Sequence, residues 1–64
     1  MTIEKAVSVL HDHSIDTMEK DGKVFAACDF TENGGPLCRV WDEVAEKDGK
    51  ITVHGVPLYS WLGY

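Results

Sequence analysis

The first apolar positions of the chain follow the spacing of an amphipathic helix. Four of them fit the i, i+3, i+4, i+7 template: Ile3, Ala6, Val7 and Leu10. Thr2 precedes them, and its hydroxyl can accept a hydrogen bond from a free backbone N–H group of the first helical turn. Ser14 and the β-branched Ile15 end the pattern. We therefore expect a helix from Ile3 to about His13.

Residues 15–30 predict a β-hairpin. Two strand-like runs flank Asp21-Gly22, a dipeptide that suits a two-residue type I′ turn because both central positions need a positive φ. The turn pairs Lys20 with Lys23, Glu19 with Val24, Met18 with Phe25 and Thr17 with Ala26. One face, expected to meet the helices, then holds Ile15, Thr17, Val24, Ala26, Cys28 and Phe30. The other face holds Asp16, Met18, Phe25 and Ala27, and its Met18–Phe25 pair needs cover or a partner.

Residues 36–49, PLCRVWDEVAEKDG, separate into two faces when they are read at 100° per residue. The apolar face holds Leu37, Val40, Trp41, Val44 and Ala45, and the opposite face holds Arg39, Asp42, Glu43 and Glu46. Pro36 suits the first position of a helix, and Gly49 suits a left-handed C-cap. A strand is the alternative, because Val40, Asp42 and Val44 also alternate, but Trp41 would then leave the apolar face. The spacing favours a helix over 37–47.

Residues 51–58 predict a second hairpin around His54-Gly55. Its register places Val53 opposite Val56, Ile51 opposite Leu58 and Thr52 opposite Pro57. Proline lacks the N–H that an interior strand needs, so we expect the last strand to lie at an edge of the sheet. Residues 59–64, YSWLGY, predict a final helical turn closed by Gly63.

The pentapeptide EKDGK occurs twice, at 19–23 and at 46–50. The flanking residues do not match, and the first copy reads as a hairpin turn whereas the second reads as a helix exit. We therefore interpret the repeat as a coincidence. Together the elements predict an α+β fold of two layers, with two helices on one face of a four-stranded antiparallel sheet in the order α-β-β-α-β-β.

Composition limits the classes of function. The chain has 64 residues, of which 44% are hydrophobic, so we expect residues 1–64 to form a single compact domain. Eleven acids against six bases give a net charge of −5, which argues against direct binding to nucleic acid or to an anionic membrane and permits binding to a basic surface. No apolar run is long enough to span a membrane, and the first residues do not resemble a secretory signal. We expect a cytoplasmic protein.

Candidate catalytic and metal-binding residues are few. The only metal set would join His11, Asp12 and His13 to Cys28 and Cys38. Histidines at i and i+2 of a helix point about 160° apart, and no C-x-x-C or H-x-x-x-H spacing occurs, so we expect neither a metal nor a cofactor. The cysteines are expected as free thiols, although a disulfide would stabilise so small a domain. No serine stands in a nucleophile motif and no phosphate-binding loop occurs, which predicts a protein that is not an enzyme.

The acidic face of the expected helix and the C-terminal aromatic residues are the candidate binding surface. Asp42 and Glu46 repel each other at i, i+4, and Glu46 and Asp48 oppose the dipole at a helix C-terminus. This mismatch favours a surface kept for a partner; the alternative is a solvated face. Trp61 is expected in the core. The predicted partner-binding residues are Glu32, Asp42, Glu43, Glu46, Asp48, Tyr59 and Tyr64.

In size, acidity and α+β patterning the whole chain resembles the small inhibitor proteins that phages and mobile elements make, anti-CRISPR proteins among them. The resemblance implies a monomeric, non-enzymatic inhibitor in the cytoplasm of the host cell, which blocks a basic nucleic-acid-binding surface of a host protein or ribonucleoprotein complex. An alternative is a structural module that dimerises through the Met18–Phe25 face or the Val56–Leu58 edge. A small redox or metal protein is a third.

Overall fold

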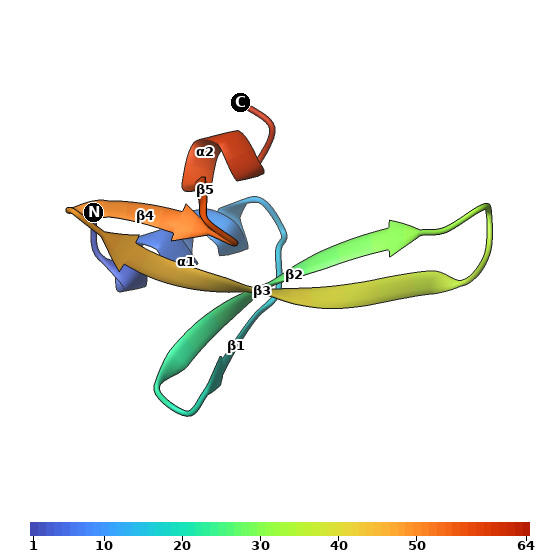
Figure 1. Cartoon of the computed structure of the whole chain (residues 1–64), viewed down its shortest axis with the longest axis horizontal. Coiled ribbons are helices and arrows are strands. Elements are labelled where there is room, and N and C mark those ends of the chain that lie inside the picture. The colour runs from blue at the N-terminus through green and yellow to red at the C-terminus, as the bar shows by residue number, and fades with distance from the viewer.

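The structure is a computed structural model that describes residues 1–64. It contains one antiparallel sheet of five strands and two short helices, one near each end of the chain (Figure 1). The elements are α1 (Ile3–Asp12), β1 (Thr17–Lys20), β2 (Lys23–Thr31), β3 (Leu37–Lys47), β4 (Lys50–Val53), β5 (Val56–Pro57) and α2 (Leu58–Trp61). The strands neighbour one another in chain order, β1-β2-β3-β4-β5. The α+β class is therefore confirmed, but the predicted four strands and helix order are not.

The first helix and the first hairpin form as their sequence patterns predict. The Thr2 hydroxyl accepts a hydrogen bond from the Lys5 N–H at 3.1 Å, which caps α1. Asp21 and Gly22 have φ values of 53° and 75°, as a type I′ turn requires. The register of β1 with β2 agrees at all four predicted pairs: Thr17–Ala26, Met18–Phe25, Glu19–Val24 and Lys20–Lys23.

The helix predicted over 37–47 is wrong, because these residues form the strand β3. The strand pairs with β2 at eight positions and with β4 at four. This pairing gives a second neighbour to β2, a nine-residue strand that would otherwise lie at an edge. In a strand, Asp42 and Glu46 are about 13 Å apart. The electrostatic mismatch of the expected helix therefore disappears, and with it the argument for an acidic helix face.

The turn at Asp48-Gly49 explains the error. These residues have φ values of 53° and 77°, and a glycine of positive φ can either end a helix or close a hairpin. Here it closes a hairpin, with Lys47 opposite Lys50 just as Lys20 lies opposite Lys23. The second copy of EKDGK is therefore a hairpin turn and not a helix exit. Both copies of the pentapeptide form the same local structure.

The second predicted hairpin is confirmed for its first two pairs, Val53–Val56 and Thr52–Pro57. The strand β5 ends there and lies at the edge of the sheet, as expected from Pro57. Leu58 does not pair with Ile51 but begins α2, and both side chains are buried in the same core. Gly63 has a φ of 98°, and the Tyr64 N–H donates to the Tyr59 carbonyl at 2.9 Å, which closes the final helical turn.

One face of the sheet, here called the inner face, forms the core with both helices. The central residues of the core are Ala6, Leu10, Ala26, Val44, Ile51, Val53 and Leu58. The registers of β2, β3 and β4 place all the strand members of this set on the same face. Trp61 packs against them, as expected. No helix of the structure has the length and apolar character that crossing a membrane requires.

Candidate functional site

The outer halves of β2 and β3 extend beyond the helices as a two-stranded projection (Figure 1). We call residues 28–31 of β2, the loop 32–36 and residues 37–41 of β3 the ribbon. The pairing of β1 with β2 stops at Ala26, and the pairing of β4 with β3 begins at Val44. The strands of the ribbon therefore pair only with each other. Isolated two-stranded ribbons are marginally stable in water, so this one depends on the rest of the sheet.

The ribbon exposes apolar side chains on both of its faces. Phe30, Val40 and Leu37 are 41%, 46% and 68% exposed. Phe30 lies opposite Cys38 and Val40 lies opposite Cys28, so these four side chains share the inner-face side of the ribbon, outside the buried core. Leu37 lies on the other side. An apolar patch of this kind marks an interaction surface more often than a single exposed leucine does.

The opposite side of the ribbon carries an ion-pair cluster of Arg39, Asp29 and Asp16, here called the Arg39 cluster. Arg39 Nε and Nη2 contact the two carboxylate oxygens of Asp29 at 2.6 and 2.9 Å, and Nη2 contacts Asp16 Oδ2 at 3.1 Å. The guanidinium also lies 5.4 Å from the centre of the Trp41 ring. Its hydrogen bond to Asp29 lowers the pKa of that carboxyl below its ordinary value and raises the pKa of Arg39.

The predicted acidic residues do not form one surface. Glu32 lies in the loop of the ribbon and Asp48 in the turn after β3, and between them stand the eleven residues of β3, roughly 35 Å of strand. Glu43 projects from the face opposite to Asp42 and Glu46, because side chains alternate along a strand.

Asp42 is a structural residue of the fold. Its side chain is 13% exposed, and its Oδ2 accepts a hydrogen bond from Trp61 Nε1 at 3.1 Å. His54 Nδ1 lies 4.0 Å from the other carboxylate oxygen. The carboxylate therefore ties α2 to β3 and is not displayed to a partner.

The C-terminal tyrosines belong to α2 and the chain end, which lie on the side of the helices and away from the loop of the ribbon (Figure 1). The Tyr59 and Tyr64 rings meet edge to face at 6.0 Å, and the Tyr64 hydroxyl lies 3.2 Å from His13 Nε2. This second contact joins the end of the chain to the end of α1. Tyr59 and Tyr64 remain 50% and 77% exposed and are therefore accessible. Of the acidic residues grouped with them, Asp42 lies beside α2 through its bond to Trp61, whereas Glu32 lies in the loop of the ribbon.

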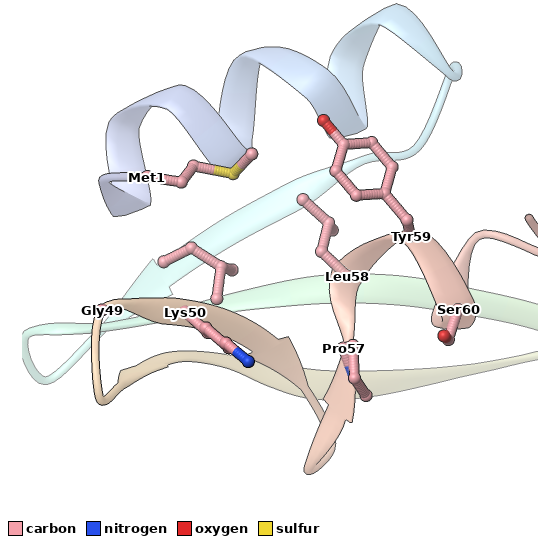
Figure 2. A pocket seen from close by; sticks show the side chains of 8 residues that line it. Met1, Gly49, Lys50, Pro57, Leu58, Tyr59 and Ser60 are labelled. Atoms are coloured by element: carbon pink, nitrogen blue, oxygen red, sulfur yellow. The ribbon is translucent and has the colours of Figure 1, made fainter.

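Tyr59 also borders a hollow of about 280 Å³ (Figure 2). Met1, Ile51, Pro57 and Leu58 supply its apolar lining, and Lys50 is the one charged side chain on it. Figure 2 shows the Tyr59 ring and Met1 on the side of α1, with Lys50 across from them. Sites for small molecules are commonly about 300–1,000 Å³ with several convergent polar groups. This hollow is smaller and has no such group of polar residues.

The histidines and cysteines are spread over the molecule. His11 Nε2 lies 3.0 Å from the Thr17 hydroxyl, and His13 contacts Tyr64. Cys28 and Cys38 are free, half-buried thiols on neighbouring strands, and each lies opposite an apolar residue of the ribbon. The structure contains no group of three His, Cys, Asp or Glu side chains arranged to hold a metal ion.

Comparison with models of known protein families, with characterised proteins and with solved structures gives no match to this chain. The ribbon holds three of the seven large apolar side chains that the fold leaves exposed, Phe30, Leu37 and Val40, and is therefore our candidate site. Sequence reasoning missed both the ribbon and the Arg39 cluster, because it placed Arg39 on a helix. The Asn33-Gly34 dipeptide was the signal for the ribbon, since its φ values of 52° and 72° reverse the chain between β2 and β3.

Proposed function

We propose that this chain is a non-enzymatic protein-binding module that presents the ribbon to another protein. The supporting observation is the exposure of Phe30, Leu37 and Val40 on a projection outside the core. These side chains contribute nothing to the buried cluster, so folding alone gives no reason to keep them apolar. Protein-binding sites combine such apolar groups at their centre with polar groups at their rim.

The partner class that we favour is a basic surface of a host protein or ribonucleoprotein complex, with inhibition of the anti-CRISPR kind. The net charge of −5 supports this class, because attraction between opposite charges accelerates association with a basic surface. Repulsion between like charges disfavours a nucleic acid as the direct partner. The acidic contacts would come from exposed carboxylates at the two ends of the ribbon, Glu32 in its loop and Glu43 at its base.

Capture from a host lysate with two matched variants tests this function. In the ribbon variant, Phe30→Ser and Leu37→Ser remove two exposed apolar side chains. In the control, Tyr59→Ser and Tyr64→Ser remove two rings outside the ribbon that are somewhat more exposed, at 50% and 77% against 41% and 68%. We expect the ribbon variant to retain its circular dichroism spectrum and to bind the partner at least about thirtyfold more weakly, because the loss of each of the two interface anchors costs roughly 1–2 kcal/mol.

The control variant should capture the partner as the unmodified chain does. Raising the salt concentration should weaken capture by the unmodified chain and by the control variant alike. If the tyrosine variant loses the partner and the ribbon variant retains it, the site lies at the C-terminus and the proposal is wrong. Capture that salt does not weaken would contradict a basic partner surface but not the role of the ribbon.

A further inference from the structure

The outer side of β3 in the ribbon is the longest unpaired strand edge of the molecule. Residues 37–42 of β3 pair with β2 on one side and have no strand on the other. We call this stretch the β3 edge. The free edges of β1, of β5 and of residues 28–31 of β2 are shorter, at four, two and four residues.

The backbone groups on the β3 edge can be assigned from one hydrogen bond. The Glu43 carbonyl accepts the His54 N–H at 3.0 Å, so the polar backbone groups of Glu43 point away from β2. This direction alternates along a strand, and Leu37, Arg39 and Trp41 therefore point their N–H and C=O groups to the same side. No strand lies beside Leu37, Arg39 and Trp41 on that side, so their outward N–H and C=O groups have no strand to pair with.

The β3 edge is less protected than the edges of β1 and β5, because its two charged side chains, Arg39 and Asp42, are already engaged by other residues of the chain. Pro57 occupies one of the two residues of β5, and it has no N–H to offer. Glu19 and Lys20 place charges on half of β1. The β3 edge contains no proline and no lysine, and its register with β2 runs without a bulge from residue 37 to residue 44.

We infer that the β3 edge pairs, antiparallel and about a two-fold axis, with the same edge of a second copy of this chain. The inference goes beyond the proposed function: it assigns the backbone edge of β3 to a second copy of the chain and leaves the exposed side chains on the faces of the ribbon to the captured protein. Pairing centred on Arg39 places Leu37 opposite the partner's Trp41 and Cys38 opposite the partner's Val40. Every outward N–H and C=O of the edge then meets its complement, since the three facing pairs each exchange two hydrogen bonds.

The side chains of the edge match a second copy in polarity and in charge. Around the central Arg39 pair, Leu37 faces the partner's Trp41 on one face of the extended sheet and Cys38 faces the partner's Val40 on the other, so the flanking contacts are apolar on both faces. The central Arg39 side chains do not repel strongly, because each guanidinium is held by Asp29 and Asp16 on the β2 side of its own chain. The acids responsible for most of the net charge lie outside this edge, so a second copy meets a nearly neutral strand.

Cysteine trapping tests the pairing and its register. In a Cys28→Ser background, Val40→Cys places a thiol opposite the partner's Cys38, at a separation that suits a disulfide. The Cys28→Ser change is needed because Cys28 lies opposite residue 40 in the same chain. The matched control is Cys28→Ser with Val56→Cys, which puts the new thiol on β5 at a similar exposure.

We expect mild oxidation to give the Val40→Cys chain twice its 7.1 kDa mass and to leave the control monomeric. Peptide mapping of the oxidised product should show that the new disulfide joins Cys38 of one copy to the thiol introduced at position 40 of the other.

Amide exchange at increasing protein concentration gives a second readout, on the unmodified chain. The amides of Leu37, Arg39 and Trp41 should exchange more slowly as the dimer forms. The amides of Cys38 and Val40 should not change, because they already bond to β2. The sedimentation mass should rise over the same concentration range.

The outcomes separate this inference from the proposed function. A chain that stays monomeric, with no disulfide between Cys38 and the introduced thiol and no change in exchange, overturns the dimer; if the ribbon variant still loses its captured partner, the proposed function stands. Protection of Leu37, Arg39 and Trp41 only after the captured protein is added would overturn the dimer and assign the edge to a strand of that protein.

A disulfide formed by Val56→Cys would overturn the proposed register, because it would place the interface at β5. Loss of both dimer and capture would remove the ribbon as a binding arm.

Discussion

At the scale of single residues, strand register decides which charges act together. Arg39 stands ten residues from Asp29 in the chain, yet the two are direct cross-strand partners and form a bidentate ion pair. On a helix, Arg39 would have no such partner. Because the pair is exposed to solvent, it lowers the pKa of the Asp29 carboxyl group but contributes little to the free energy of unfolding.

The pKa of Asp29 gives the first prediction. The ion pair keeps this pKa below its usual value of 3.8, so the stability that the charged carboxylate contributes is present above that value and is lost as the pH falls through the lowered pKa. We expect the side-chain carbonyl resonance of Asp29 to titrate below its usual range by NMR, and Arg39→Gln to return it there. Lys47→Gln, which removes a cation outside the cluster, should not move it. An equal shift in both variants would show that net charge, and not the pair, sets the pKa.

At the scale of elements, four dipeptides ending in glycine form the chain reversals of the sheet. They are Asp21-Gly22, Asn33-Gly34, Asp48-Gly49 and His54-Gly55, and all eight residues have positive φ. The two copies of EKDGK are the clearest case, because the same five residues give the same turn twice. The repeat is thus a local structural signal whatever its evolutionary origin.

Replacing either turn glycine by alanine should destabilise the chain. Gly22 and Gly49 have φ values of 75° and 77°, and a Cβ at either position would meet nothing within 4 Å. The cost is therefore one of backbone conformation, and we expect Gly22→Ala and Gly49→Ala to lower the free energy of unfolding by about 1 kcal/mol each, measured in urea. D-alanine, which favours positive φ, should restore stability at both sites. A loss with D-alanine as large as with L-alanine would contradict this account.

The parts of the fold that short-range signals specify were predictable from sequence. Capping by Thr2, the Asp21-Gly22 register and the edge position of Pro57 each depend on a few neighbouring residues. The strand β3 was not predictable in this way, because its apolar residues fit two periods and Gly49 suits the end of either element. Tertiary pairing with β2 decided between them. The candidate site followed the same error, since its acids were placed on a helix face that does not exist.

At the scale of the whole molecule, the core is small, and few contacts connect the helices to the sheet. Only eight of the 64 residues are buried, so single contacts between elements carry a large share of the stability. The hydrogen bond from Trp61 to Asp42 is one such contact, because it connects the C-terminal helix to the middle of the sheet.

Removing either member of this hydrogen bond should destabilise the fold. We expect Asp42→Ala to lower the free energy of unfolding by about 1–2 kcal/mol, because it leaves the half-buried indole N–H without a partner. Glu43→Ala, at the exposed neighbouring position, should change it by less than about 0.5 kcal/mol. In a double-mutant cycle, Asp42→Ala and Trp61→Phe should be non-additive. Equal effects of Asp42→Ala and Glu43→Ala would show that the bond does not matter for stability.

The meander order of the strands has a consequence for how quickly the chain folds. Each strand pairs with its neighbour in sequence, and the connections between strands span two to five residues, so the entropy of loop closure is small at every step of sheet formation. Proteins with such local contacts fold rapidly for their class. The exception is α1, whose Leu10 must join a core that includes Val53 and Leu58, more than forty residues away in the chain. We expect the docking of this helix, and not the assembly of the sheet, to set the folding rate.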